Sequence, residues 1–391
     1  MVKNLITGVG GFVASHLARL LLNKKEEVIG SYRWTEDLSR IRDIQEYIKM
    51  VPADLLDAFS LIRLIANNKP DYIFHLAAQS YVPDSFTNPI ITIQTNTIGT
   101  VNLLEAIRFV QEYLDTEYDP VIHVCSSSEF YGKVDADEIP ITEKHEMRPG
   151  NQYAIGKIGA DAAGYFYNKY YGMKIIRTRM FTHTSGRRTM MSAECAFAKQ
   201  IAEIEAGLRE PVIKHGNLDS LRTWAHAEDA VEAYWLMVRH CKPGEVYNIG
   251  GEIEKTIGEM LDYMISLSPM KDKIRKELDP TRIRKLDVNL QSVDISKFKE
   301  DCPQWKPKYS FEEIIQDVLD GWRERVRMTK LMKEGRDEKG RRGGYLEAHH
   351  KVPLRDLFGT KREEEIFDPD NGQTLCKACH GEIDKYRANN V

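Results

Sequence analysis

Apolar positions in the first thirty residues follow the order strand, turn, helix, strand. The apolar run NLIT is followed by a turn that carries Gly8, Gly10 and Gly11. FVASHLARLLL then repeats its apolar residues at the spacing of a helix, and EVIGSY has the short apolar pattern of a second strand. These four elements together predict a βαβ unit.

Further strand-like runs follow along the first half of the chain, at residues 50–54, 71–78 and 120–126. Amphipathic helical segments such as residues 99–114 separate them. Strands that alternate with helices form a parallel sheet with helices on both faces. We therefore expect an α/β fold with a doubly wound parallel sheet.

The glycine turn indicates nucleotide binding. Glycine between a strand and a helix lets the backbone approach a pyrophosphate, whose charge then meets the N-terminal amides and dipole of the helix. Ala14 stands where a third glycine is usual, and it is small enough for close packing of the helix on the sheet.

The end of the second strand bears on which dinucleotide is bound. An acidic residue there would bond a ribose hydroxyl, whereas arginine would favour a 2′-phosphate. The strand ends in GSYRW, with Arg33, and Arg40 follows. This favours NADP over NAD, although both arginines could also be ordinary surface residues.

Length, composition and charge set the broad class. The 391 residues, with 42% hydrophobic content, predict two or three domains. A formal net charge of −4 argues against general binding of polyanions by the whole chain. No run approaches about 18 uninterrupted apolar residues, so we expect no membrane contact. The chain begins directly with a strand and without a leader, which favours a cytoplasmic protein.

The cysteines divide into two groups. Four are scattered, which fits a reducing compartment, and two form a CxxC near the C-terminus: Cys125, Cys195, Cys241 and Cys302, and then Cys376 and Cys379.

The candidate chemistry lies in residues 125–157. CSSSEFYG places Ser127 and Glu129 at the end of an apolar strand, and NQYAIGK places Tyr153 four residues before Lys157. On a helix this spacing puts both side chains on one face, where an ammonium group favours the phenolate form of a tyrosine. The pair alone is more often an ordinary helix face, and only the surrounding residues favour acid–base chemistry.

The order of motifs resembles that of the extended short-chain dehydrogenases/reductases, in the sugar-nucleotide epimerase and dehydratase group. The resemblance covers roughly residues 1–326 and is carried by TGVGGFVASHL, LAAQSYVPDSF, NTIGTVNLLEA, SSSEFYG and YAIGK. Later segments, RTRMFTHTSGRR, GNLDSLRTWAHAEDAVEAYWLM and WKPKYSFEE, resemble the branch of GDP-mannose 4,6-dehydratase and GDP-4-keto-6-deoxymannose reductase. The resemblance implies a Rossmann core at roughly residues 1–180, a smaller substrate lobe mainly within 181–326, and a homo-oligomer.

The resemblance also implies catalytic roles for four residues. Tyr153 would be the acid/base, Lys157 would lower its pKa and hold the nicotinamide ribose, and Ser127 would bond the sugar O4. In a dehydratase, hydride leaves C4 for NADP+, Glu129 removes the C5 proton, water leaves from C6, and the hydride returns to C6.

Binding residues are implied in the same way. The cofactor residues would be Gly8, Gly10, Gly11, Phe12, Val13, Arg33, Asp54, Leu55 and Ala77, together with Tyr153 and Lys157. The residues for a GDP-sugar would be Ser85, Thr182, His183, Asn217, Arg222, Arg284 and Asp287. Relatives commonly read FNH where this chain has Phe181, Thr182 and His183.

Two activities remain open at this point. Glu129 and the Arg187–Arg188 pair favour a dehydratase, whereas FAKQIAEIEAG and EPVIKHGNL resemble the reductase at least as closely. We favour the dehydratase, with the reductase as the alternative.

The C-terminal sequence has a different composition. Residues 327–344 are rich in charge and end in glycines, which predicts a linker. Residues 345–391 resemble an HNH nuclease, a small ββα-metal fold. That resemblance implies a divalent metal held by His349 and His380, with His350 activating water and Asn371 fixing the loop. Nucleic acid would be a partner only through this segment. The CxxC has no second pair to complete a zinc site.

Overall fold

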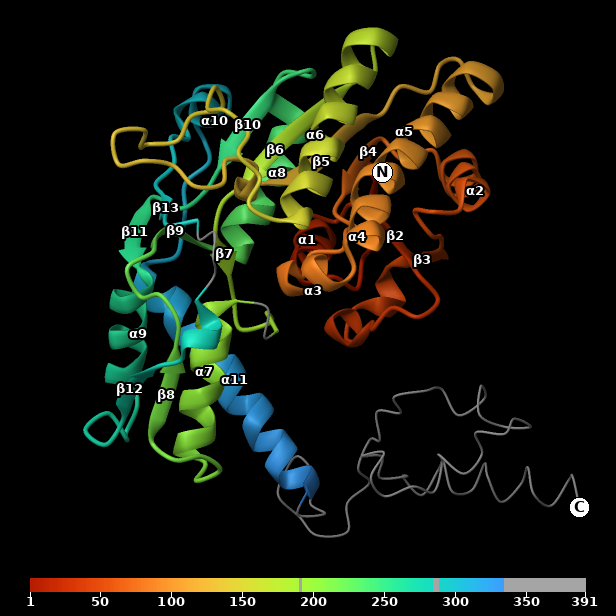
Figure 1. Ribbon diagram of the computed structural model, residues 1–391. Helices are drawn as coiled ribbons and strands as arrows, with labels where there is room; N and C mark the ends of the chain where they lie inside the picture. The colour runs from red at the N-terminus through yellow and green to blue at the C-terminus, as the bar shows by residue number, and fades with distance from the viewer. Residues whose placement is uncertain (190–191, 284–287, 334–391) are drawn as a thin grey trace, which may run out of the picture. The chain divides into compact units, whose positions relative to one another are not determined.

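The computed structural model describes residues 1–189, 192–283 and 288–333 (Figure 1). Contacts within the chain divide it into two compact units, residues 1–322 and 323–391. The strands described below all belong to the first unit.

Seven strands of the described residues form one sheet, and every pairing among them is parallel. Its order reverses beside the first strand, which lies between the second and the fourth. In sheet order the strands are β10 (Val246–Ile249), β6 (Ile175–Met180), β5 (Val121–Ser127), β4 (Tyr72–His75), β1 (Lys3–Thr7), β2 (Glu27–Tyr32) and β3 (Lys49–Pro52). Ligands of such sheets bind in the crevice at the carboxyl ends of the strands, at the point of reversal.

Helices cover both faces of this sheet, because its strands bury side chains on both sides. Ile6 and Phe74 belong to one apolar core, whereas their neighbours Leu5 and Ile73 belong to the other. The first core contains residues of α1 (Phe12–Asn23), α8 (Ala227–His240) and α10 (Ser296–Asp301), and the second contains residues of α2 (Ala58–Asn68), α5 (Gly99–Phe109) and α6 (Gln152–Tyr171). The predicted doubly wound α/β fold is confirmed.

Short helical segments connect these elements. They are α3 (Val82–Thr87), α4 (Pro89–Ile93), η1 (Ser39–Ile41), η2 (Gln45–Tyr47), η3 (Gln94–Ile98), η4 (Val110–Leu114), η5 (Ser128–Phe130) and η6 (Pro280–Arg282). The predicted helix at residues 99–114 corresponds to α5 and η4, and η3 joins α4 to α5 without a break.

The second half of the chain builds a smaller lobe from short strands and helices. Its strands are β7 (His183–Thr184), β8 (Val212–His215), β9 (Leu221–His226), β11 (Ile253–Thr256), β12 (Arg275–Leu278) and β13 (Leu290–Gln291). β9 lies at the centre, paired with β7, β11 and β13, while β8 pairs with β12. The helices of this smaller lobe are α7 (Ala193–Glu205), α9 (Ile257–Ser266) and the start of α11 (Phe311–Lys333).

The boundary predicted near residue 180, between the Rossmann core and the substrate lobe, does not separate the chain into two continuous segments. After β9 the chain returns to the large sheet, where β10 pairs with β6 and α8 packs beside α1. A parallel edge strand needs a crossover connection, and α8 supplies it. The substrate lobe is therefore interrupted by a strand and a helix of the Rossmann core.

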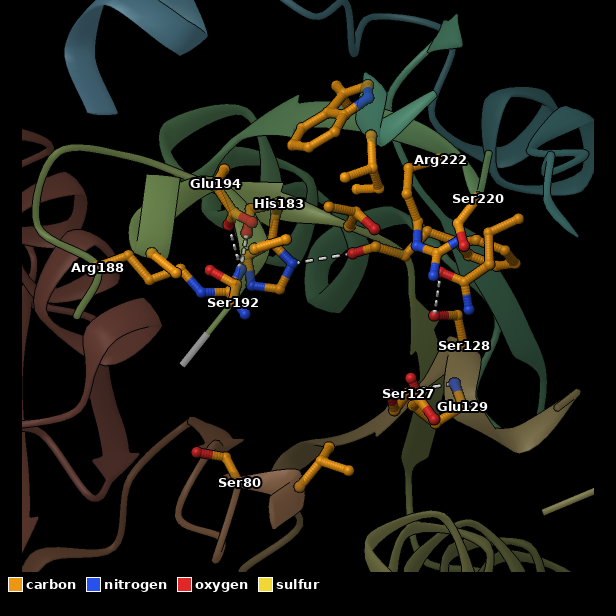
Figure 2. Close-up of a pocket in the computed structure, with 18 of the residues that line it drawn as sticks. Ser80, Ser127, Ser128, Glu129, His183, Arg188, Ser192, Glu194, Ser220 and Arg222 are labelled. Carbon is orange, nitrogen blue, oxygen red and sulfur yellow. Dashed lines mark hydrogen bonds and ion pairs between the residues drawn. The ribbon is translucent and has the colours of Figure 1, made fainter. Parts of the chain in front are cut away.

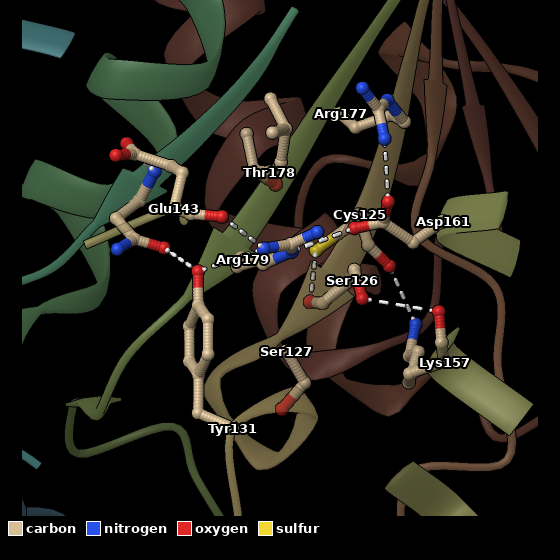
Figure 3. Close-up of polar contacts among 12 residues, drawn as sticks. Cys125, Ser126, Ser127, Tyr131, Glu143, Lys157, Asp161, Arg177, Thr178 and Arg179 are labelled. Carbon is tan, nitrogen blue, oxygen red and sulfur yellow. Dashed lines mark hydrogen bonds and ion pairs between the residues drawn. The ribbon is translucent and has the colours of Figure 1, made fainter. Parts of the chain in front are cut away.

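A buried ion triad ties the longest helix of the core to the sheet (Figure 3). Asp161 of α6 is 3% exposed and accepts hydrogen bonds from two arginines of β6. Arg177 Nη1 lies 2.7 Å from Oδ1, and Arg179 Nε lies 3.0 Å from Oδ2. Arg179 Nη1 also donates to the hydroxyl of Tyr131 at 3.1 Å. One carboxylate thus balances two guanidinium groups that are almost wholly removed from water.

Replacing Asp161 by Ala should destabilise the first unit by about 3–5 kcal/mol, because two buried cations lose their counter-charge. Urea unfolding followed by tryptophan fluorescence measures this free energy. Asp119→Ala is the control, since Asp119 pairs with Lys174 at an exposed site and its loss should cost no more than about 1 kcal/mol. Equal midpoints for the two variants would contradict the structural role of the triad.

The predicted C-terminal segment lies mostly beyond the described part of the chain. α11 continues to Lys333, so the first residues of the predicted linker are helical. His349, His350 and His380, the residues of the predicted metal and nuclease site, lie outside the described residues, as do Asn371 and the CxxC. The HNH-like segment stays a prediction from sequence.

The described residues contain neither a metal cluster nor a membrane helix. Within them no group of three or more His, Cys, Asp or Glu side chains is arranged to hold a metal ion. No helix in this part of the chain is both long enough and apolar enough to cross a membrane. The four scattered cysteines are free thiols.

Candidate active site

The glycine turn after β1 lets a ligand approach the backbone closely. Gly8 has a φ of 67°, in the left-handed region that favours glycine, and a Cβ there would lie 3.0 Å from the Cα of Ala77. The N–H of Gly11 donates to the Gly8 carbonyl at 2.9 Å. Helical residues begin at Phe12 and Val13, at the end of a helix where amides have no partner within the helix. This cradle fits the pyrophosphate of a dinucleotide.

Thr7 joins this turn to the loop after β4. Its Oγ1 accepts the N–H groups of Leu76 at 3.1 Å and Ala77 at 3.0 Å. These two bonds hold the Ala77 backbone against Gly8 and set the width of the crevice.

Two predicted cofactor residues follow β3. Asp54 is exposed, and its Oδ1 accepts the N–H of Leu56 at 2.9 Å. Leu55 is buried against Gly99, where a Cβ would lie 2.8 Å from the Cβ of Leu55. Both residues thus lie beyond the carboxyl end of a strand of the sheet, where the crevice is expected.

The edge of the crevice beyond β2 contains an acid as well as the predicted arginines. Arg33 is exposed there, and Arg40 points its Nη1 toward the Gly10 carbonyl at 3.5 Å. The Glu36 carboxylate accepts the N–H of Arg33 at 3.1 Å and also that of Gly10. Burial raises the pKa of Glu36. The sequence analysis did not select Glu36, which follows Arg33 by three residues.

A pocket of about 570 Å³ lies between the core and the smaller lobe of the first unit (Figure 2). It brings together residues that are far apart in the sequence. Of the predicted residues, its wall contains Ser127, Glu129, Tyr153, Thr182, His183, Asn217 and Arg222.

Glu129 is held in the pocket wall by Asn151, the residue that caps the N-terminus of α6. Asn151 Oδ1 accepts the N–H of Ala154 at 2.8 Å, which is the N-cap of α6. Its Nδ2 donates to Glu129 Oε2 at 2.8 Å. The Glu129 N–H donates to Ser127 Oγ at 3.2 Å. One side chain therefore fixes both the start of α6 and the direction of a carboxylate.

Tyr153, in the first turn of α6, lies in the wall with Ser127 and Glu129. Burial raises the pKa of Tyr153 well above its usual value. The Ser127 hydroxyl and the positive charge of Arg188 lower the same pKa, whereas Glu129 raises it. The pKa of the Tyr153 phenol therefore depends on the residues that line the pocket with it.

Lys157 follows Tyr153 by one turn of α6. It is buried, and its Nζ donates to the Cys125 carbonyl at 2.8 Å (Figure 3). Burial lowers the pKa of this ammonium group. Lys157 does not belong to the pocket wall, and its predicted roles toward Tyr153 and the nicotinamide ribose stay predictions.

The predicted sugar and nucleotide residues occupy the second-half side of the wall. The His183 ring nitrogen Nδ1 donates to the Phe181 carbonyl at 2.9 Å, and burial lowers the pKa of His183 to about 4. Asn217 Nδ2 donates to Ser220 Oγ at 3.1 Å, and Arg222 Nη1 donates to the Leu221 carbonyl at 2.7 Å. His183 is therefore neutral near pH 7, and Arg222 supplies a positive charge for an anionic ligand.

Ser85 is not among the residues of this wall. It is fully buried, and its hydroxyl donates to the Val82 carbonyl at 2.7 Å within α3. Its predicted contact with substrate stays a prediction. Arg284 and Asp287 lie outside the described residues.

Several residues of the site were not predicted from the sequence. Glu194 and Arg282 of the pocket wall are polar residues in segments without a recognisable motif, and Arg188 was noted only as part of an arginine pair. Asn151, which bonds the wall residue Glu129, was not predicted either. The signal for Asn151 was present, since Asn directly before a helical run is a typical N-cap. The others become neighbours only through the tertiary fold.

A doubly wound parallel sheet, a glycine cradle at its first crossover and a Ser–Tyr pocket with a buried lysine define a class of protein. This is a nicotinamide-dinucleotide enzyme with a short-chain dehydrogenase/reductase type of Rossmann fold. The chain belongs to the GDP-mannose 4,6-dehydratase family, whose model matches residues 5–318.

Individual relatives agree with this assignment. A GDP-mannose 4,6-dehydratase of Vibrio cholerae is 34% identical, with 84% of this chain and 96% of the relative covered. That of Yersinia enterocolitica is 31% identical, with 85% and 97% covered. A GDP-6-deoxy-D-mannose reductase of Pseudomonas aeruginosa is 26% identical, with 82% and 97% covered.

Solved structures resemble the same part of the chain. RMD from Pseudomonas aeruginosa complexed with NADPH has a TM-score of 0.69 at 25% identity, covering 83% of this chain and all of that one. DesIV, a dTDP-glucose 4,6-dehydratase from Streptomyces venezuelae with NAD and TYD bound, has a TM-score of 0.70 at 24% identity, covering 83% and 97%. The second likeness shows the fold alone.

Proposed function

We propose that this chain is a GDP-mannose 4,6-dehydratase, which converts GDP-mannose into its 4-keto-6-deoxy derivative with loss of one water. The observation that carries the proposal is the pocket wall in which Ser127, Glu129 and Tyr153 lie together. A hydroxyl, a carboxylate and a phenol at one place suit the removal of one proton from the C4 hydroxyl and another from C5 of a sugar.

The first step needs a base at the C4 hydroxyl. Tyr153 takes this proton, and Ser127 bonds the same oxygen and lowers the pKa of the phenol. Arg188 lowers the same pKa through its charge. A nicotinamide bound in the crevice supplies the hydride acceptor at C4 and afterwards the hydride donor at C6.

The second step needs a base at C5, where a proton becomes acidic once C4 is a ketone. Glu129 is a carboxylate that Asn151 holds in the wall at 2.8 Å, so it is oriented before substrate arrives. The carboxyl group that takes the C5 proton can return it to the C6 hydroxyl, which leaves as water. Return of the hydride to C6 leaves C5 in need of a proton, which Tyr153 supplies from the proton that it took from the C4 hydroxyl, so both residues end as they began.

The nucleotide end fits the opposite part of the wall. Arg222 offers a fork of donors suited to diphosphate oxygens, and Asn217 offers both a donor and an acceptor. We retain Arg284 and Asp287 as proposed nucleotide contacts from the sequence, although they lie outside the described residues.

The test uses GDP-mannose labelled with deuterium at C4, supplied with oxidised cofactor. Mass spectrometry should show a product lighter by one water that keeps the deuterium at C6, without net reduced cofactor. UDP-glucose and dTDP-glucose are the controls for the nucleotide. Turnover of either control but not of GDP-mannose would refute the GDP assignment.

A GDP-4-keto-6-deoxymannose reductase is the second candidate. It is favoured by the similarity to the GDP-6-deoxy-D-mannose reductase of Pseudomonas aeruginosa, 97% of which is covered by the match. This activity consumes reduced cofactor on the keto sugar. Oxidation of NADPH with that substrate, together with no reaction of GDP-mannose, would reverse the assignment.

We propose NADP as the cofactor, because Arg33 stands directly after β2. Glu36 opposes this preference, since its carboxylate lies at the same edge. Glu36→Gln should strengthen binding of NADP relative to NAD about threefold to tenfold, because neighbouring like charges near a surface repel by about 1 kcal/mol or more. Fluorescence titration of both reduced cofactors measures this ratio, with Glu46→Gln as a control. An unchanged ratio would exclude Glu36 from cofactor selection.

We also propose that the chain forms a homo-oligomer through the faces of α4, η3, α5 and α6. These helices expose large apolar side chains: Ile90, Ile91, Ile98, Phe109, Phe166 and Tyr170. Exposed apolar surface of this extent is typical of a contact with another chain. Light scattering of the purified protein tests the assembly, and a monomeric mass would contradict it.

The free thiols fit the cytoplasm, which we propose as the location of the protein.

A further inference from the structure

One residue of the pocket wall, Glu194, has no role in the reaction described above. It belongs to the first turn of α7 and is 3% exposed. Its Oε1 has no hydrogen-bond partner. A buried carboxylate oxygen without a donor is costly, so such a group in a ligand pocket calls for a donor from the ligand.

Glu194 is balanced in charge by Arg188. Nη1 of Arg188 lies 3.5 Å from Glu194 Oε1 and donates to the His183 carbonyl at 2.5 Å. These residues lie on one side of the pocket, whereas Ser220 and Arg222 lie on the other (Figure 2). The ion pair lowers the free-energy cost of burying a charged carboxylate in the wall. Because Arg188 Nη1 and Glu194 Oε1 are farther apart than in a normal hydrogen bond, Oε1 can still accept a hydrogen bond from a ligand.

This side of the pocket borders both the cofactor helix and the reacting phenol. The guanidinium of Arg188 lies 5.6 Å from the centre of the Phe12 ring, at the first residue of that helix, and its charge lowers the pKa of Tyr153. The His183 ring is stacked on the same phenyl ring at 6.1 Å. Because Glu194 and Tyr153 line the same pocket, a hexose bound at Tyr153 lies in the same cavity as the Glu194 carboxylate.

The chemistry of a carboxylate limits the class of ligand that Glu194 can bind. An ionised carboxylate only accepts hydrogen bonds, and it repels a diphosphate. A hexose offers several hydroxyl donors. We propose that Glu194, held by Arg188, forms a subsite that binds a ring hydroxyl of the hexose. This rests on the proposed function, since it assumes a nucleotide-hexose substrate.

The test compares a ligand that has the hexose with one that lacks it. Calorimetry on a Tyr153→Phe chain, which binds without turnover, measures the Kd of GDP-mannose and of GDP. Adding Glu194→Gln keeps an acceptor oxygen but removes its charge, so it should weaken GDP-mannose binding about 5- to 10-fold, the difference between a charged and a neutral hydrogen bond. The Kd of GDP should stay the same. Glu203→Gln, on the same helix and paired with Arg209, is the matched control and should change neither value.

Other outcomes distinguish failure of the hexose subsite from failure of the proposed function. Equal weakening of both ligands, or no weakening of either, would overturn the hexose subsite. If the Tyr153→Phe chain binds no GDP-mannose at all while it binds another sugar nucleotide, the proposed function itself fails. Glu194→Asp provides a second variant if the amide does not fold: it keeps the charge beside Arg188 but withdraws the acceptor. It should lose GDP-mannose affinity selectively and to a smaller extent.

Discussion

Tyr153→Phe should lower kcat for GDP-mannose by about 10³-fold, within the range of about 10²–10⁴ that a positioned acid or base supplies. The change removes only the phenolic oxygen, so α6 and the pocket wall keep their shape. Initial rates by mass spectrometry of the product measure the effect, and GDP binding should stay unchanged.

Tyr165→Phe is the matched control. Tyr165 lies on the same helix, is 51% exposed and does not belong to the pocket wall, so the same change there should leave kcat unaltered. A Tyr153→Phe chain that retained turnover within tenfold of the parent would exclude Tyr153 as the base.

The pH dependence of Tyr153 has a definite sign. Burial raises the pKa of this phenol, and the active base is its deprotonated form, so kcat should increase as the pH rises. The Ser127 hydroxyl lowers the same pKa. Ser127→Ala should therefore move the rising limb of the kcat profile to higher pH. A shift to lower pH would contradict the contact between these two side chains.

Glu129→Gln should lower dehydration by about 10²–10⁴-fold, because the amide cannot remove the C5 proton. Oxidation at C4 requires Tyr153 and not Glu129, so it should survive. Reduced cofactor and the 4-keto sugar should then accumulate in amounts equal to the enzyme. Nicotinamide fluorescence follows the first, and mass spectrometry after rapid quenching identifies the second.

Glu129→Gln removes only the base, because Gln can still accept the hydrogen bond that Asn151 donates to Glu129. Glu146→Gln serves as the control, since Glu146 is exposed and pairs with Arg148 away from the pocket wall. If Glu129→Gln left dehydration intact, Glu129 would be a bystander. Loss of dehydration with retained reduction of a keto sugar would separate the dehydratase from the reductase.

Much of the site was readable from local sequence. Gly8 needs a positive φ, and the turn in which it lies is set by the adjoining strand and helix. Tyr153 and Lys157 share a helix, so their proximity follows from helical geometry. The roles came from a resemblance and stay predictions; the structure adds that Lys157 bonds the Cys125 carbonyl and that the charge of Arg188 lowers the pKa of Tyr153.

Other residues could not be assigned without the fold. Ser85 stands in a recognisable motif, but its hydroxyl turns back to the Val82 carbonyl. Glu36 looks like a surface acid until the loop after β2 brings it to the Gly10 amide. Glu194 lies on an amphipathic helix whose pattern does not tell which polar position faces a pocket.

The sequence by itself determined the alternation of strands and helices, the glycine turn and the Ser–Glu and Tyr–Lys pairs. Each of these depends on contacts within a few residues, where spacing and residue type decide the geometry. The tertiary structure alone decided that β10 returns to the large sheet and that Asn151 orients Glu129. It also decided that Arg188 and Glu194 meet His183 at the pocket. Those contacts depend on how loops close between distant elements, which local periodicity does not encode.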